Sequence, residues 1–306
     1  MTWVRIPACA RNKMKEKIAK FHDKHYKTIL IIPVLLLAIS LLYIGAYYSK
    51  TGDFFEKDIS LTGGTSITLY GTFDKAKLEA DLTPLLDSAS IREVSDVITH
   101  EQKAVIVETR TDGDQARAVL EKYLGHPLNE KNSSFEFTGA SLSESFYKQL
   151  LIAILIAFVF MALVVFILFR TLVPSVAVII SAFADIVMAL ATVDILGIKM
   201  SSAGIVALLM LIGYSVDTDI LLTTRMLKRT EGSLNSRIFS AFKTGTTMTL
   251  TSLFAILFAL IIVRTFSVVL TEIFTILVIG LFFDLINTWI TNVSLLKWYM
   301  HRHRKK

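Results

Sequence analysis

Six long apolar runs restrict the fold of this chain more than any other feature. They cover approximately residues 29–48, 149–169, 172–196, 201–223, 246–263 and 269–293. A transmembrane α-helix needs roughly 17 to 25 apolar residues, so each run can cross a bilayer. With 53% hydrophobic residues among 306, the chain is predicted to be a polytopic α-helical membrane protein.

Charged residues surround these runs unevenly and predict the topology. Residues 1–28 carry eight Lys/Arg and two acids, and the tail 297–306 is also basic. Positive charge favours the cytoplasmic side of a membrane. We therefore expect a multi-pass protein of the cytoplasmic (cell) membrane with both termini inside, in which 29–48 is the first span and 149–296 a five-helix bundle. Because the asymmetry reflects topology, we do not expect nucleic-acid binding.

Residues 49–148 are predicted to form an extracytoplasmic domain. Residues 50–148 hold 11 Lys/Arg and 17 Asp/Glu, a net charge of −6. Alternation and helical spacing favour six elements in the order β-α-β-β-α-β, a ferredoxin-like arrangement in which two helices cover one sheet face and leave the other open. The elements are Thr65–Tyr70, Asp74–Leu86, Ile91–Thr99, Ala104–Thr109, Asp112–Leu124 and Ser134–Thr138.

No motif in this domain indicates catalysis. It lacks a nucleophile set, a carboxylate pair in a pocket signature and a phosphate-binding loop, so the chain is not predicted to be an enzyme or to need a cofactor. Cys9 is the only cysteine, which excludes an internal disulfide, and the six histidines show no zinc spacing. No metal site is expected.

The acids within the apolar runs are the candidate functional residues. Asp217 and Asp219 lie in the inner half of the fourth run, and an ionisable group inside a membrane is costly and usually functional. At about 100° per residue these two side chains point to nearly opposite sides of a helix. One of them is expected to face an ion path, and the sequence leaves open which one.

Other polar residues of the spans are expected to support this path. Asp185 and Asp284 lie deep in their runs, and we predict that both approach the fourth span and share a polar patch with it. Supporting roles are predicted for Asn287, Lys243, Arg225, Thr247 and Thr251. For the threonines, close helix packing is an equal alternative.

Three short stretches resemble the SecF branch of the SecD/SecF family of protein-export membrane proteins, within the RND superfamily. They are Leu61-Thr62-Gly63-Gly64, Gly213-Tyr214-Ser215-Val216 and Lys243-Thr244. The sixth run, Ile279 to Trp289, is more similar to the archaeal branch. Ser60 stands where the family signature has Asp. Thr218 stands where bacterial members carry an acid, whereas Asp217 fits the superfamily spacing Gly-x-x-Val-Asp.

The resemblance implies a function and partners. It implies a subunit that acts with a SecD-like chain beside the Sec translocon and uses the proton or ion gradient to help export an unfolded polypeptide. It ranks Asp217 above Asp219 as the protonatable group. We predict that Lys243 pairs with a core acid, the option that the resemblance implies, or with a membrane lipid phosphate. The alternatives are an RND-type half-transporter for lipids or small molecules, and a scaffold of the translocon that transports nothing.

Overall fold

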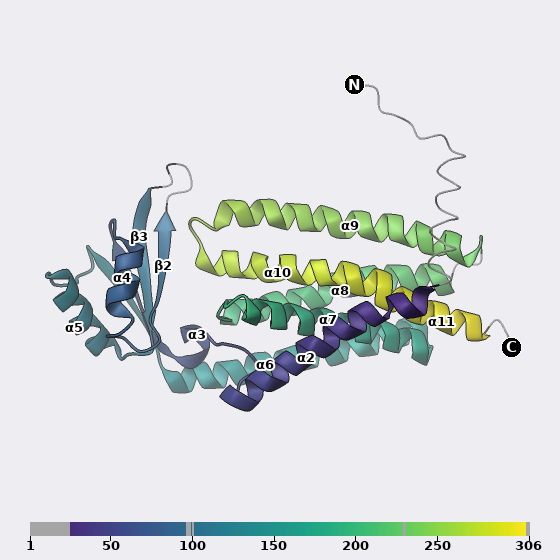
Figure 1. Cartoon of the computed structure of the whole chain (residues 1–306), viewed down its shortest axis with the longest axis horizontal. Helices are drawn as coiled ribbons and strands as arrows, with labels where there is room; N and C mark the ends of the chain where they lie inside the picture. The colour runs from purple at the N-terminus through teal and green to yellow at the C-terminus, as the bar shows by residue number, and fades with distance from the viewer. Residues whose placement is uncertain (1–24, 96–98, 100, 229–230, 304–306) are drawn as a thin grey trace, which may run out of the picture.

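The computed structural model describes residues 25–95, 99, 101–228 and 231–303. The predicted basic segment 1–28 therefore lies mostly outside the described residues. Within them, six helices are long and apolar enough to span a membrane, which confirms the predicted number. They run along the long axis of the molecule, and a small α/β domain lies at one end, opposite the C-terminus (Figure 1).

The bounds of the membrane helices extend most of the predicted runs. The first five are α2 (Ile31–Thr51), α6 (Ala140–Phe169), α7 (Leu172–Ile195), α8 (Ser202–Leu227) and α9 (Leu234–Val263). The sixth consists of α10 (Val268–Ile286), a π-helix η1 (Asn287–Asn292) and α11 (Val293–His303), and these follow one another without a break. Lys297, which was expected to begin a basic tail, is instead a buried residue of α11.

Two of the membrane helices are central. More than half of the apolar stretch of α7 and of α8 is buried, whereas only 6 to 11% of that stretch is buried in α2, α6 and α9. Their exposed side chains are largely apolar, for example Leu42, Phe160 and Phe254. Such a surface suits contact with lipid. Polar groups of membrane spans usually face the bundle interior, and the central helices α7 and α8, with α10, can hold them there.

The α/β domain has the predicted order of elements. It contains β1 (Gly64–Tyr70), α4 (Lys75–Leu82), β2 (Ser90–Ser95), β3 (Gln102–Thr109), α5 (Gly113–Leu124) and β4 (Ser133–Thr138). The strands form one antiparallel sheet in the order β2-β3-β1-β4. Alternate residues such as Ile67, Leu69, Val105 and Val107 are buried against the two helices, since strand side chains alternate between faces.

Two boundaries differ from the prediction by four residues, and the others differ by two residues or fewer. The first helix ends at Leu82 rather than Leu86, because Pro84 has no N–H to continue the hydrogen-bond ladder. The second strand ends at Ser95, and most of the rest of its predicted length lies outside the described residues. Asp74 caps the first helix as expected, since its side chain accepts a hydrogen bond from the Lys77 N–H.

We expected the second sheet face to be open, but part of it is covered. It turns toward the membrane bundle (Figure 1). On this face, Arg92 of β2 lies 3.7 Å from the carboxylate of Asp58, at the start of the short helix α3 (Ile59–Thr62). The backbone N–H of Ser95 donates to the carbonyl of Thr265 in the loop between α9 and α10. The domain therefore rests on the bundle through part of this face.

Candidate functional site

Three carboxylates meet in the interior of the membrane bundle. They are Asp185 on α7, Asp219 on α8 and Asp284 on α10, and each is 0% exposed. The predicted approach of Asp185 and Asp284 to the fourth span is therefore present. We call these residues, with the hydroxyl and amide groups that bind them, the carboxylate cluster.

The first part of the cluster surrounds Asp185. Its Oδ2 accepts a hydrogen bond of 2.5 Å from the Ser215 hydroxyl on α8. Its Oδ1 accepts one of 2.7 Å from the side-chain amide of Asn287, the first residue of η1. Asn287 is thus a member of the cluster, as predicted, and Asp185 is joined to two other helices.

Two threonine hydroxyls connect the other carboxylates. Thr288 Oγ1 lies 2.9 Å from Asp219 Oδ1 and 3.1 Å from Asp284 Oδ1. Thr218 Oγ1 lies 3.1 Å from Asp284 Oδ1 and 2.9 Å from the backbone carbonyl oxygen of Ser215. A hydroxyl has one hydrogen to donate, so Thr288 can serve only one carboxylate at a time. Its rotation would couple the hydrogen bonding of Asp219 to that of Asp284.

One side of Asp219 has unused hydrogen-bonding capacity. The side-chain amide of Asn292 donates to Asp219 Oδ1 at 2.7 Å. Asp219 Oδ2 and Asn292 Oδ1 are buried, and neither has a hydrogen-bond partner among the described residues. Buried oxygen atoms normally have partners, so the free lone pairs of these two atoms could accept a proton or another hydrogen-bond donor.

None of the ion pairs among the described residues involves Asp185, Asp219 or Asp284. Three neighbouring buried negative charges would repel one another and would lack hydration, which costs several kcal/mol per ion, to order of magnitude. Bound protons or a bound cation would remove that repulsion. In the part of the chain that the structure describes, no group of three or more His, Cys, Asp or Glu could hold a metal ion.

The local helix geometry explains why these residues meet. Ser215, Thr218 and Asp219 are spaced three and four apart, which places them on one face of α8. Asp284 and Thr288 are four apart on the sixth span. The π-helix η1 then widens the turn, and π-helical turns occur often at functional sites. Asn287, Thr288 and Asn292 are all buried there.

Asp217 is not part of the cluster. It is exposed on the bundle surface, as are Gly213 and Tyr214, while Ser215 and Val216 point inward. The two acids of α8 thus point in different directions, as the helical angle predicted. Geometry favours Asp219 for the interior position, the reverse of the ranking that the superfamily spacing implied.

The predicted supporting residues of α9 also lie elsewhere. Lys243, Thr247 and Thr251 are exposed, and the two threonine hydroxyls donate to carbonyls one turn earlier in the same helix. Arg225, at the end of α8, donates to the carbonyl and hydroxyl of Ser240 on α9. Arg225 therefore joins two helices, and none of these four residues contacts the three carboxylates.

Comparison with known proteins identifies the family. The family of protein-export membrane proteins SecD and SecF, C-terminal part, matches residues 119–302. The chain is 41% identical over 289 residues to the protein-export membrane protein SecF of Methanocaldococcus jannaschii, covering 92% of this chain and 99% of that protein. It is 35% identical to the SecF of Pyrococcus furiosus, covering 96% and 98%. The chain belongs to the SecD/SecF family.

A solved structure of the family supports the fold. SecDF of Thermus thermophilus matches with a TM-score of 0.70 at 20% sequence identity. The match covers 90% of this chain but only 38% of that longer chain. This chain therefore shares the fold of the matched part of that structure.

The SecF-like signature Leu61-Thr62-Gly63-Gly64 has a packing role. Gly63 has a φ of +82°, and a Cβ there would lie 2.5 Å from Cα of Ala140 at the start of α6. Gly64 has a φ of +150°, and a Cβ there would overlap the carbonyl oxygen of Thr109. Only glycine fits at either position, because both the backbone conformation and the space require it.

Sequence reasoning missed several members of the site in this SecD/SecF family protein. Thr218, Thr288 and Asn292 were not selected, although Asp284, Thr288 and Asn292 recur every fourth residue in an apolar span. That spacing was the available signal, because it marks one helix face. Comparison with bacterial members of the family indicated that position 218 lacks an acid, and the hydroxyl of Thr218 was therefore not considered.

Proposed function

We propose that this chain is a SecF-type subunit that couples ion movement through the carboxylate cluster to protein export. The observation that carries the proposal is the set of three buried carboxylates, linked by hydroxyl and amide groups and absent from the ion pairs of the described residues. A structural ion pair would include a cation. A cluster whose internal repulsion is removed by bound protons or a bound cation is suited to load and release them.

The energy available fits this role. Moving one charge through a potential of 100 mV is worth about 2.3 kcal/mol. Protonation gives a carboxylate one O–H donor and reduces its capacity to accept, so some of the bonds from Ser215, Thr218 and Thr288 would rearrange. These bonds join α7, α8 and the sixth span. Loading of the cluster would thereby bias the packing of the central helices.

A SecD-type partner would cover the exposed polar face of α8. Asp217, Tyr214 and Gly213 lie on this face, within a membrane span. A carboxylate facing lipid is costly, whereas a neighbouring polar helix can satisfy it. We infer that this face contacts the SecD-like subunit. Lys243 on α9 would pair with a lipid phosphate at the membrane surface.

The α/β domain would act outside the cytoplasm, with both chain termini inside. Its sheet order and element order support a ferredoxin-like assignment. Strand β4 is an edge of the sheet, and Phe137 on it is 65% exposed. An edge strand can add an extended peptide through backbone hydrogen bonds, which tolerates many sequences. We propose that it receives the unfolded polypeptide beside the translocon.

Replacement of each acid by asparagine in cells tests the proposal. Asp219→Asn, Asp185→Asn and Asp284→Asn should each reduce secretion of a reporter protein while the subunit remains in the membrane at normal levels. Asp217→Asn should have a smaller effect. Normal secretion by all three cluster variants would contradict ion coupling and favour the scaffold alternative.

A further inference from the structure

The outer end of α8 is held by groups from two other parts of the chain. The backbone N–H of Ser201 donates to the carboxylate of Glu272 on α10 at 2.7 Å. The N–H of Ser202 donates to the hydroxyl of Ser60 at 3.1 Å. The next two N–H groups are capped by the Ser201 hydroxyl itself. The first N–H groups of a helix lack partners within it, so Ser60 and Glu272 complete this helix end.

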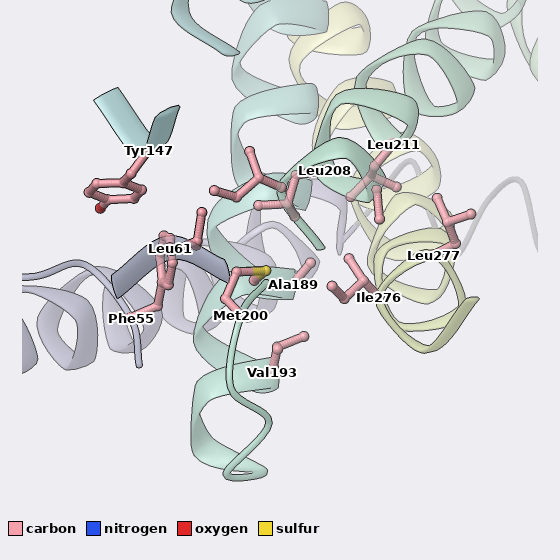
Figure 2. Packing of buried hydrophobic residues seen from close by; sticks show 12 residues of the cluster. Phe55, Leu61, Tyr147, Ala189, Val193, Met200, Leu208, Leu211, Ile276 and Leu277 are labelled. Carbon is pink, nitrogen blue, oxygen red and sulfur yellow. The ribbon is translucent and has the colours of Figure 1, made fainter. Parts of the chain in front are cut away.

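Ser60 belongs to residues 55–62, which we call the docking segment because they pack onto the bundle. The backbone N–H of Asp58 donates to the carbonyl of Met200, and the N–H of Met200 donates to the carbonyl of Glu56. Phe55 and Leu61 enter the hydrophobic cluster at the outer end of α7, α8 and α10, beside Tyr147 and Met200 (Figure 2). The docking segment is therefore fixed to the start of α8 by backbone bonds and apolar burial.

The docking segment also contacts the α/β domain. The guanidinium of Arg92 on β2 lies 3.7 Å from Asp58 and 3.2 Å from Glu108 on β3. Immediately after the segment, Gly63 and Gly64 pass against Ala140 and Thr109, with no room for a side chain. A displacement of the segment would consequently reach the sheet directly, because close-packed contacts transmit rather than absorb small shifts.

Helices α8 and α10 are in close contact from the docking segment to the carboxylate cluster. A Cβ on Gly204 of α8 would overlap Glu272, and a Cβ on Gly280 of α10 would overlap Leu211. Further along, Thr218 bonds Asp284. Ser202 and Thr218 are 16 residues apart, which is about 24 Å at 1.5 Å per residue. Helices α8 and α10 can therefore move as one body over that length.

We propose that Ser60 and Glu272 are positioning residues that connect the carboxylate cluster to the α/β domain through α8. Loading of the cluster shifts α8 and α10 together, Ser60 and Glu272 carry that shift to the docking segment, and the segment moves the sheet. This role rests on the proposed function of the cluster. It adds the route by which a change inside the membrane reaches the domain.

Distance measurements between two spin labels test the connection. The labels are placed at Phe137 on β4 and at Leu172, at the opposite end of the bundle, where the side chains are 65% and 68% exposed. Cys9 is first replaced by serine, and the full chain is studied in lipid nanodiscs. Asp219→Asn supplies the perturbation of the cluster. In the parent, the distance distribution should shift when Asp219 is replaced.

When Asp219→Asn is introduced into chains that already carry Ser60→Ala or Glu272→Leu, the distance distribution should not shift. The shift should return in Ser60→Asp and in Glu272→Gln, which keep an oxygen acceptor for the helix N–H. Ser267→Ala is the matched control, because it removes the cap of α10 at the same end of the bundle without touching the docking segment. That variant should keep the shift. If Glu272→Leu does not reach the membrane, Ser60→Ala carries the test alone.

The outcomes separate this connection from the proposed function. A shift that persists unchanged in Ser60→Ala and Glu272→Leu would overturn the role of these two residues and leave ion coupling intact. A parent without any shift would overturn the connection, while secretion by Asp219→Asn in cells would still decide the function of the cluster. Failure of the Asp and Gln variants to restore the shift would also contradict the role as stated.

Discussion

Thr218 is the residue whose chemistry in the carboxylate cluster is simplest to isolate. Its hydroxyl bonds Asp284, and valine has nearly the same shape without the hydroxyl. Thr218→Val should reduce export, because Asp284 loses the hydroxyl that contacts it and helps to hold it beside α8. The free energy of unfolding should fall by about 1 to 3 kcal/mol, the usual cost of leaving a buried group unpaired.

Thr218→Ser is the control for this prediction, since serine keeps the hydroxyl. Export from cells and thermal unfolding in detergent should both remain close to the parent for Thr218→Ser. Equal export by the Val and Ser variants would show that the hydroxyl has no part in transport.

Glu108 predicts a pH dependence of the α/β domain. Burial, and then the negative charge of Asp58, raise the pKa of Glu108 from 4.5 to about 7, although Arg92 and Lys199 oppose this. The folded domain therefore holds a proton that the unfolded chain has released. The contribution of Glu108 to the free energy of unfolding is fully present below about pH 4.5 and is lost as pH rises through about 7.

Thermal unfolding of the full chain at several pH values measures this effect. The parent should lose stability between pH 4.5 and 7, and Glu108→Gln should lose less of it over the same interval. Glu101→Gln, at an exposed position, should behave as the parent does. An unchanged slope in Glu108→Gln would assign the pH dependence to another group.

Individual acids were predicted from the sequence better than their partners were. Asp185, Asp284 and Asn287 could be selected because polar groups are rare inside apolar spans. The directions of Asp217 and Asp219 could be separated by the helical angle, but their assignment to inside and outside depends on which neighbours pack on α8. That packing involves residues far apart in the chain, so no local pattern contains it.

The π-helix η1 is the element that brings the sixth span into the cluster. A π-helical turn holds more residues than an α-helical one, so it changes which side chains share a face. Deletion of Ile290, a half-buried residue of η1, should restore α-helical geometry and leave the flanking helices in register. The amide of Asn292 or the hydroxyl of Thr288 would then turn away from Asp219.

Export should be lost in the Ile290 deletion while the protein still inserts and remains helical by circular dichroism. Deletion of Leu295, a half-buried residue of the α-helical part α11, provides a comparison outside the π-helix. Normal export after loss of Ile290 would show that the π geometry is not needed.

Helix types and boundaries were largely predictable, whereas helix roles were not. The spans and the α/β order follow from hydropathy and periodicity alone. The threonine run of α9 looked suited to a polar path, but α9 lies at the edge of the bundle, and Thr247 and Thr251 bond their own backbone. A hydroxyl that is satisfied within its helix can face lipid at low cost. The position of a helix in the bundle therefore decided its role.

At the scale of the whole molecule, the exposed polar face of α8 predicts where a partner binds. Tyr214→Cys, in a chain with Cys9 replaced, should form a crosslink to a SecD-like subunit in native membranes. Phe160→Cys on α6 is the control, because its position is equally within a span and is surrounded by exposed apolar residues. Crosslinking to the partner from Phe160 but not from Tyr214 would place the interface on another side.

The central claim is that the carboxylate cluster converts an ion gradient into export. Its most direct test is the rate of export into membrane vesicles as the imposed proton-motive force is varied, with the parent chain and with Asp219→Asn. The parent rate should rise with the imposed force, and the Asp219→Asn rate should stay at the value found without a gradient. An Asp219→Asn rate that rises as the parent rate does would contradict the claim.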